Sequence, residues 1–272
     1  MALHNYHDTH LRFPHNEREN TNSSALVKLL PFFEQLAIYN AIDLAAGNVA
    51  NQTIDGTVLD NRVIDNLQCP SESKGPLMPN GKAQSSYATS MGAQDMDGCD
   101  VTTVVTYPDP YDSNDDGEDP FNRGNIRADY GRSGEISGVF GRGYFTPPWA
   151  ARFSDVQDGT SNTIAMGEVR MVCSSGNMEH GGGAGWAEGD GMWFATTMPI
   201  NFPTCEGENG YTGSGCANRP NNWTSMGFKS LHPGGAQFVF VDGSVNFLPE
   251  TIEHITYQRL GDRHDGEVIG EY

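Results

Sequence analysis

Basic residues are scarce in this chain of 272 residues. It carries 16 Lys and Arg against 35 Asp and Glu, which gives a formal net charge of -19 at pH 7. Proteins that bind nucleic acid through its phosphates need a basic stripe that releases counterions, so we expect no nucleic-acid partner. The acid excess instead favours a solvated surface, cation binding or a saline environment.

Long apolar runs and common catalytic or metal-binding motifs are absent as well. No run reaches the ~18 apolar residues that a membrane-spanning helix needs, so we expect these residues to be soluble and to carry no signal peptide. No CxxC pair occurs, which argues against a structural zinc site of the usual spacing. Neither a nucleophile elbow nor an HExxH motif occurs, so we expect a protein that is not an enzyme.

Glycine is abundant, at 33 residues, and 15 prolines accompany it. Because Gly, Pro, Asn and Asp favour turns, the composition predicts a loop-rich and strand-rich protein rather than a helical bundle. No linker divides the chain clearly, so we expect a single domain over 1–272. It is expected to contain a His-rich helix end at 1–20, a helical and irregular region at 21–100, and a β-rich region with a C-terminal hairpin at 101–272.

Apolar patterns predict the elements within these regions. A broad apolar face over 24–46, with Pro31 in its first turn, indicates the clearest helix, and a second helix is expected over 57–67. Runs of β-branched and apolar residues predict short strands. These strands are expected near 101–106, 139–144, 163–170, 191–197 and 236–241.

The C-terminal hairpin is predicted to turn at Asp242 and Gly243, because an Asp-Gly pair suits a two-residue type I′ turn. In that register four apolar side chains share one face, which we expect to be buried. They are Phe238, Phe240, Val245 and Phe247. His232 and Asp242 then lie at opposite ends of an extended strand, so we expect no hydrolase triad that uses both. His232 is interpreted as a loop anchor hydrogen-bonded to backbone, and Asp242 as a turn former.

Five cysteines are present, and two of them bracket a glycine-rich loop. Cys205 and Cys216 are predicted to form a disulfide, which would stabilise the fold by roughly 2–3 kcal/mol on the chain-entropy model. The alternative is two reduced thiols in a cytosolic protein. A Cys69–Cys99 bridge is also considered, and the odd count leaves at least one thiol without an intrachain partner. On balance the cysteines favour an oxidising, extracytoplasmic location.

An acidic loop at 109–119 carries the first half of a calcium-binding pattern. Alternate Asp and Asn residues followed by glycine can converge on an ion, and Ca²⁺ prefers six to eight oxygen ligands. The twelfth position is Arg123 rather than Glu, so the pattern is incomplete, and the alternative is a disordered acidic loop. The predicted calcium ligands are Asp109, Asp112, Asn114, Asp116 and Glu118.

Tryptophans lie in segments rich in glycine and asparagine, where exposed rings could stack on sugars. Trp186, Trp193 and Trp223 are therefore candidate stacking residues for a polysaccharide. The alternative is that these rings belong to the core, because aromatic side chains dominate core burial.

Several segments, in the right order, resemble a known family. They read LHNYHDTHLRFP at 3–14, LLPFFEQLAIYNAID at 29–43, LQCPSES at 67–73, DVQDGTSNTIAMGE at 155–168 and LHPGGAQFVFVDGSVNFLPETI at 231–252. The chain is similar to the prepilin-type family of planctomycete bacteria, whose C-terminal domain is named for a His, nine residues and Asp-Gly. Here that pattern runs from His232 to Asp242 and Gly243.

The resemblance implies an α+β fold in which a pilin-like N-terminal helix packs on an antiparallel β-sheet elaborated with long loops and insertions. Family members begin with a type IV pilin-like leader and a long apolar helix that runs into the segment at Leu3. The chain therefore resembles the truncated ectodomain of a membrane-anchored precursor, held in the inner membrane before assembly and exposed in the periplasm or at the cell surface. Major pseudopilins also carry calcium in acidic C-terminal loops, which is compatible with a site in this chain.

Three functions follow as hypotheses. The resemblance favours a non-enzymatic structural subunit of a pilus-like or type II secretion pseudopilus assembly, with itself or other pilin-like subunits as partners. The alternative is an extracellular binding module for a polysaccharide or another solute, and the two can coexist because a fibre can present a ligand site. A hydrolase is the third hypothesis, and it lacks a recognisable nucleophile motif.

Overall fold

The structure is a computed structural model of the chain. It describes residues 1–17, 20–93, 136–141, 148–173, 184–189, 191–213, 224–270 and 272. The α-helices are α1 Ala2–His10, α2 Ala25–Leu29, α3 Leu36–Asn40 and α5 His254–Gly261. The 3-10 turns are η1 Leu30–Phe33, η2 Val49–Asn51, η3 Leu59–Asn61, η4 Asp65–Leu67, η6 Phe153–Asp155, η7 Met171–Cys173 and η8 Thr224–Met226. The strands are β1 Thr53–Ile54, β2 Thr57–Val58, β3 Tyr87–Ser90, β4 Ile164–Glu168, β5 Trp193–Phe194, β6 Gly235–Phe240 and β7 Val245–Pro249.

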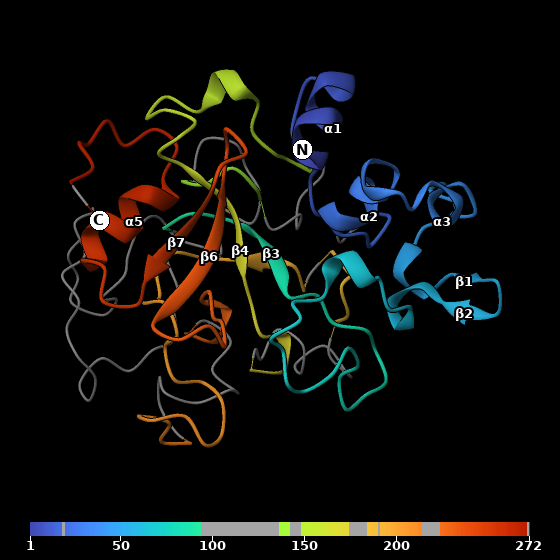
Figure 1. Cartoon of the computed structure of the whole chain (residues 1–272). Coiled ribbons are helices and arrows are strands. Elements are labelled where there is room, and N and C mark those ends of the chain that lie inside the picture. The colour runs from blue at the N-terminus through green and yellow to red at the C-terminus, as the bar shows by residue number, and fades with distance from the viewer. Residues whose placement is uncertain are drawn as a thin grey trace.

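A five-stranded sheet occupies the centre of the fold (Figure 1). Its strand order is β5-β3-β4-β6-β7, and β1 and β2 pair separately as a small antiparallel sheet. Neighbouring strands of the large sheet are antiparallel except β3 and β5, which are parallel. Short helices around these two sheets confirm the predicted α+β class, while the β3–β5 pair corrects the expectation of a purely antiparallel sheet.

Two histidines hold α1 against the rest of the fold. The Nε2 atom of His4 donates a hydrogen bond to the backbone carbonyl oxygen of Val241, at 2.8 Å. The Nε2 atom of His7 accepts one from the backbone N–H of Phe153, at 3.3 Å. Leu3 is buried on the same helix. The N-terminal helix is therefore fixed to the turn between β6 and β7 and to η6.

The helix predicted over 24–46 is divided into α2, η1 and α3. Pro31 has no backbone N–H to donate and lies in the first turn of η1. Glu34 ends η1 with a φ of 68°, in the left-handed region, which no α-helix can continue through. The apolar pattern was therefore interpreted correctly as helical, but its length was wrong.

The helix predicted over 57–67 is wrong. Asp55 and Gly56 have φ values of 49° and 79°, so they form the two-residue turn that joins β1 to β2. Two 3-10 turns, η3 and η4, follow instead of an α-helix. The Asp-Gly pair at 55–56 is the signal that predicts this hairpin.

The C-terminal hairpin forms, but its register differs from the prediction by one residue. Val239 pairs with Val245 and Phe238 with Asn246, because the loop has three residues and ends at Gly243 with a φ of 88°. Shifting a strand by one residue moves its side chains to the other face. Phe238 is therefore buried as predicted, whereas Val245 is 61% exposed and Phe247, predicted to be buried, is 43% exposed.

The core lies on the opposite face of the sheet, which we call the inner face. Phe238 and Phe240 point into it from β6, and the ring of Tyr257 from α5 packs 5.8 Å from that of Phe238. Phe194 of β5 lies on the same face, because the ring of Phe228 is 6.0 Å from that of Phe194 and 5.2 Å from that of Phe238. Trp186 and Trp193 are also buried, but Trp193 pairs with Thr89 and so shares the face of Met166 and Val239.

Strand predictions are confirmed where the structure describes them, with shorter bounds. The runs at 163–170, 191–197 and 236–241 contain β4, β5 and β6, while the run at 139–144 contributes an isolated bridge between Phe140 and Ala150. The strand predicted over 101–106 lies outside the described residues. In the described ranges, no helix combines the length and the apolar character that crossing a bilayer requires.

Candidate functional site

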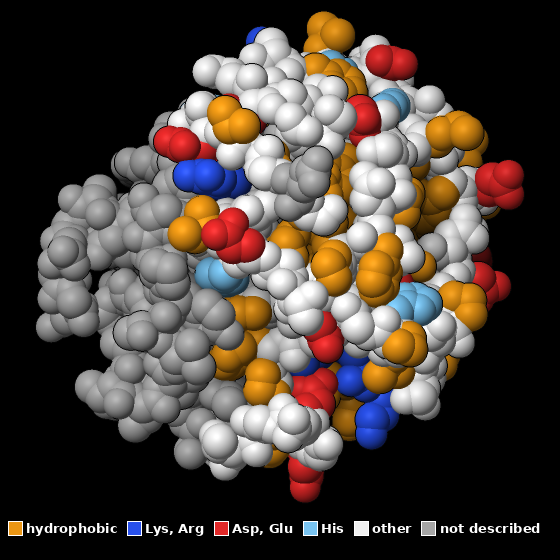
Figure 2. All heavy atoms as spheres, turned by 60° about the vertical axis from the view of Figure 1, so that its left-hand side comes forward, with side chains coloured by type: hydrophobic (Ala, Val, Ile, Leu, Met, Phe, Trp, Pro, Cys, Tyr) orange, Lys and Arg blue, Asp and Glu red, His pale blue; other side chains and the backbone are white. Residues whose placement is uncertain are grey.

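The second face of the sheet, which we call the outer face, carries exposed apolar side chains. Met166 pairs with Val239 and Val239 with Val245, so these three side chains form a row across β4, β6 and β7. Val245 and Phe247 are both exposed. Figure 2 shows hydrophobic side chains gathered on one part of the surface, with few basic side chains among them. The described residues leave this apolar surface uncovered.

A cavity of about 600 Å³, which we call the groove, lies between the outer face and the N-terminal helices. The start of α1, parts of α2 and the loop after η4 form its walls. Its apolar lining includes Leu3, Leu26, Leu29, Met166, Val239 and Val245. Cavities of this size, lined by apolar side chains with a few polar groups, are typical binding sites.

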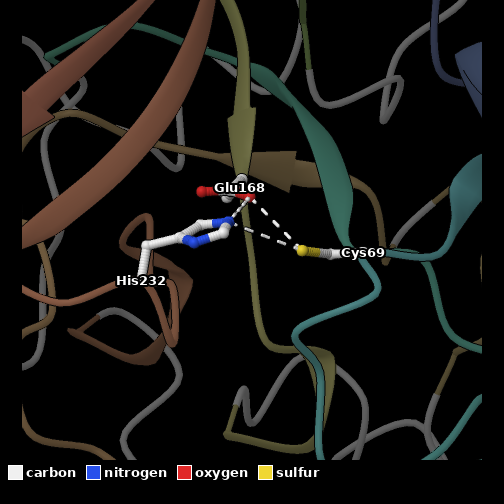
Figure 3. A group of neighbouring side chains, drawn as sticks. All are labelled: Cys69, Glu168 and His232. Atoms are coloured by element: carbon white, nitrogen blue, oxygen red, sulfur yellow. Dashed lines mark hydrogen bonds and ion pairs between the residues drawn. The ribbon is translucent and has the colours of Figure 1, made fainter.

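Three polar side chains meet at one end of the groove (Figure 3). Cys69 follows η4, Glu168 is the last residue of β4, and His232 lies in the loop before β6. They come from three of the five segments on which the family resemblance rests, and the fold brings those segments together.

The distances within this cluster are short. The Nε2 atom of His232 lies 3.2 Å from Oε1 of Glu168, and the Sγ atom of Cys69 lies 3.7 Å from the same nitrogen. The Cys69 thiol also donates to Oε1 of Glu168, at 3.6 Å. The Glu168 side chain is almost fully buried, whereas His232 is one-third exposed and Cys69 has no disulfide partner.

Backbone contacts fix how these side chains point. The N–H of Gln237 donates to Oε2 of Glu168, at 2.8 Å, which turns the other carboxylate oxygen toward Cys69 and His232. The N–H of Cys69 donates to the hydroxyl of Ser86, at 2.8 Å. Since one contact comes from β6 and the other from the residue before β3, the cluster is held by the fold rather than by one flexible loop.

Tyr87 closes the cluster on the side of β3, where it pairs with Glu168 in the register of the sheet. Burial raises the pKa of its phenol, and the neighbouring Cys69 and Glu168 raise it further. The phenol therefore stays neutral beside two groups that can carry negative charge.

A thiol beside an imidazole also suggests a cysteine nucleophile. In such a relay the imidazole uses one ring nitrogen for the nucleophile and the other for the carboxylate that orients it. Here Cys69 and Glu168 both contact Nε2 of His232 (Figure 3), so they compete for one nitrogen. The arrangement therefore suits three ligands of one bound ion better than a catalytic relay.

A buried ionic network lies behind the cluster. Arg170 pairs with Glu72 at 3.0 Å and with Glu208 at 3.4 Å, and Lys229 pairs with Glu208 at 2.6 Å. Burial lowers the pKa of Lys229, while Glu208 opposes that shift. The network joins the loop after η4 to the end of β4 and so supports the position of Cys69.

The predicted disulfide is wrong. Cys205 bonds to Cys173 across 32 residues, not to Cys216, and Cys69 is free, so the Cys69–Cys99 bridge is also wrong. The sequence predicted the loop closure from a short spacing, whereas the sheet brings the end of η7 next to the loop that contains Cys205.

The other predicted site residues either do not line the groove or lie outside the described residues. Trp186 and Trp193 are buried, so the prediction that they stack on sugars is wrong and their alternative as core residues is confirmed. Trp223 lies outside the described residues. The calcium ligands predicted at Asp109, Asp112, Asn114, Asp116 and Glu118 lie outside them too.

The structure confirms Asp242 as a turn former, whereas the ring of His232 contacts side chains and not the backbone that it was expected to bond. Asp242 accepts a hydrogen bond from the N–H of Ser244, at 2.8 Å, as expected of a turn former, and bonds with Ser244 lower its pKa. Gly243 supplies the left-handed position of the same turn. His232 was interpreted only as a loop anchor, and the contacts of its ring with Glu168 and Cys69 were missed. Cys69 lies in the segment LQCPSES and Glu168 in DVQDGTSNTIAMGE, but the spacing of these segments in the sequence does not predict that they lie side by side.

A family model described as "Protein of unknown function (DUF1559)", named SBP_bac_10, matches residues 1–254. Neither the search of curated proteins nor that of solved structures found a match.

Proposed function

The chain belongs to the DUF1559 family of proteins of unknown function, and we propose that it is a non-enzymatic structural subunit of a pilus-like or pseudopilus assembly. The observation that carries the proposal is the groove, which begins at the N-terminal end of α1 and crosses the outer face of the sheet. An apolar helical stem that continues α1 would fill it. An amphipathic or apolar helix in an apolar groove is a common mode of recognition.

The direction of α1 supports this occupant. Met1, Ala2 and Leu3 all line the groove, and in Figure 1 the N-terminus lies at the end of α1 nearer the sheet. A helix that extends α1 backwards rises 1.5 Å per residue, so about ten residues would cover ~15 Å of the outer face. Its apolar side would lie against Val239 and Val245.

The expected surroundings of such a subunit follow from the same proposal. The stem anchors the precursor in the inner membrane before assembly, and the head faces the periplasm or the cell surface, where it contacts itself or other pilin-like subunits. The Cys173–Cys205 disulfide supports an oxidising compartment. The proposal also includes a calcium ion, bound by the acidic loop over 109–119, that stabilises the head.

Expression of the complete gene product in its native host tests the proposal. We expect the protein to be retained in the membrane fraction and to appear in surface fibres by electron microscopy. A monodisperse, soluble full-length protein would contradict the proposal.

A matched pair of substitutions tests the groove itself. Val239→Asp places a charge in the groove, whereas Val268→Asp places one on a valine that is 84% exposed. We expect the first variant to lose assembly and the second to assemble like the wild type. Equal assembly of both would count against a stem in the groove.

A second candidate function is binding of an acidic polysaccharide, and a specific pocket favours it. In a chain with a charge of -19, a cavity of about 350 Å³ is lined by Arg12, Arg152 and Arg263, and Asp155 also lines it. The guanidinium of Arg263 lies 4.8 Å from the ring centroid of Trp149, which is half-buried beside the pocket. Guanidinium groups pair with carboxylates and sulfates, and the ring supplies a stacking face.

Titration with an acidic and a neutral polysaccharide, followed by tryptophan fluorescence, tests this second candidate. We expect a response to the acidic polymer that weakens at high salt and in Arg152→Ala, and none to the neutral one. A flat response to both polymers would contradict it.

A further inference from the structure

We propose that Cys69, Glu168 and His232 bind a zinc ion at the end of the groove. This inference does not depend on the proposed assembly, because the three ligand atoms are supplied entirely by described residues of the folded head.

The spacing of the ligand atoms fits a tetrahedral zinc site. With Zn–S near 2.3 Å and Zn–N or Zn–O near 2.0–2.1 Å, neighbouring ligand atoms of a tetrahedron lie about 3.3–3.6 Å apart. The observed separations are 3.2 Å from His232 to Glu168, 3.6 Å from Cys69 to Glu168 and 3.7 Å from Cys69 to His232. An ion above this triangle therefore requires only small side-chain shifts.

The donor set selects the class of metal. A thiolate is a poor ligand for Ca²⁺ and Mg²⁺, which prefer oxygen, whereas sulfur, imidazole nitrogen and carboxylate together suit Zn²⁺. The ion would also offset the repulsion between a Cys69 thiolate and the Glu168 carboxylate, which lie within 3.6 Å of each other. The absence of a CxxC pair excluded only a site of the usual spacing, and this one is assembled from three distant segments.

Neighbouring groups already orient the ligands. The Gln237 N–H occupies one oxygen of Glu168, and the other faces Cys69 and His232. Contacts of this kind, which fix ligands from behind, typically change metal affinity by about 10–100-fold.

The fourth coordination position faces the groove. All three ligands line that cavity, so the position is open to water or to a group on whatever occupies the groove. Three protein ligands with one free position define an open zinc site. A second cluster, Cys173, Cys205 and Glu208, also gathers possible ligand atoms, but its two sulfur atoms are bonded to each other and cannot serve as thiolates.

Cobalt provides a spectroscopic test on the folded chain. After metal is removed with a chelator, Co²⁺ is titrated and then displaced with Zn²⁺. We expect one ion per chain, a thiolate-to-cobalt charge-transfer band and the strong visible absorption of a tetrahedral ion. Absence of the charge-transfer band would overturn the proposal.

Variants assign the ligands. Cys69→Ser should abolish the charge-transfer band, and Glu168→Gln and His232→Asn should each weaken Zn²⁺ binding at least ten-fold. His10→Asn, which changes an exposed histidine of α1, serves as the matched control and should bind like the wild type. A band that persists in Cys69→Ser, or equal affinities in all variants, would show that the metal binds elsewhere.

A measurement on the unmodified protein covers the case in which a variant fails to fold. Iodoacetamide labelling of Cys69, located by peptide mass mapping, should be slowed at least ten-fold by stoichiometric Zn²⁺. Labelling at the same rate with and without Zn²⁺ would overturn the proposal.

Discussion

Val239 faces Val245 across the β6–β7 hairpin, and both side chains stand on the outer face of the sheet. The three-residue loop that ends at Gly243 sets this register. As a result, alternate residues of β6 serve different purposes: Phe238 fills the core, while Val239 lines the groove.

The register predicts a strong asymmetry between two phenylalanines of the hairpin. Phe238→Ala should lower the free energy of unfolding by about 3–5 kcal/mol, because a fully buried ring leaves a cavity. Phe247→Ala should cost less than about 1 kcal/mol, because its ring is 43% exposed. Urea unfolding of both variants measures the difference. Equal losses would support the two-residue turn instead.

Two glycines with left-handed backbone form a second matched pair. Gly56 has a φ of 79° and open space around it, whereas a Cβ atom on Gly243, whose φ is 88°, would lie 2.9 Å from the ring of His4. Gly56→Ala should cost about 1 kcal/mol from backbone strain alone. Gly243→Ala should cost more and also release α1. Hydrogen exchange of the α1 amides checks this, and unchanged α1 protection in Gly243→Ala would contradict it.

Reduction of the Cys173–Cys205 disulfide should destabilise the head. On the chain-entropy model, a bridge that spans 32 residues contributes about 3–4 kcal/mol. Thermal unfolding with and without reductant measures the loss. Peptide mapping of the oxidised protein should recover Cys173 linked to Cys205, and a peptide that links Cys205 to Cys216 would contradict the pairing.

Acid should destabilise the protein through a buried histidine of α5. Burial lowers the pKa of His254 to about 4 from its usual 6.5, so the folded state resists its protonation. The resulting contribution to the free energy of unfolding is fully present above pH 6.5 and is lost as the pH falls toward 4. His254→Gln should reduce the pH slope of the unfolding free energy in that window by up to about 1.4 kcal/mol per pH unit.

The matched control for the acid prediction is His10→Asn, at an exposed position of α1. The unfolding free energy of this variant should depend on pH as that of the wild type does. Burial also lowers the pKa of His15 to about 4, so His15 contributes to the slope in both proteins. Identical slopes for His254→Gln and the wild type would contradict the assignment.

Calcium binding by the acidic loop remains a prediction. Removing two carboxylates with Asp112→Asn and Asp116→Asn should abolish the heat of Ca²⁺ binding in calorimetry, because each ligand lost weakens an oxygen shell. Ser113→Ala is the matched control in the same loop. The absence of any Ca²⁺ heat in the wild type would contradict the prediction.

Local patterns predicted most of the elements but not their partners. The runs that contain β4 and β6 were identified because β-branched and aromatic residues fit a pleated surface. The Asp-Gly pair at 242–243 predicted a hairpin but not its loop length, since a three-residue loop with glycine at its end uses the same residues. Pro31 and Glu34 divided the helix predicted over 24–46 through backbone conformation that apolar periodicity does not report.

Local sequence patterns could not predict the candidate site, and the reason is a different one. Cys69 and His232 are 163 residues apart, and Glu168 lies between them. Only the order of strands in the sheet places them together, and that order includes a parallel pair that no hairpin signal predicts. Ligands that are scattered in this way have no characteristic spacing.

The hydrogen bond from His4 to Val241 joins positions 237 residues apart, and this has a consequence for biogenesis. A ribosome that adds about 5–20 residues per second needs roughly 12–50 s to make the intervening chain. During that interval α1 has been synthesised but its docking surface has not. Leu3 and Tyr6, which are buried in the folded protein, therefore remain exposed to water or bound to a chaperone or a lipid surface. Although α1 is synthesised before the sheet, it is thus among the last parts of the head to reach its final contacts.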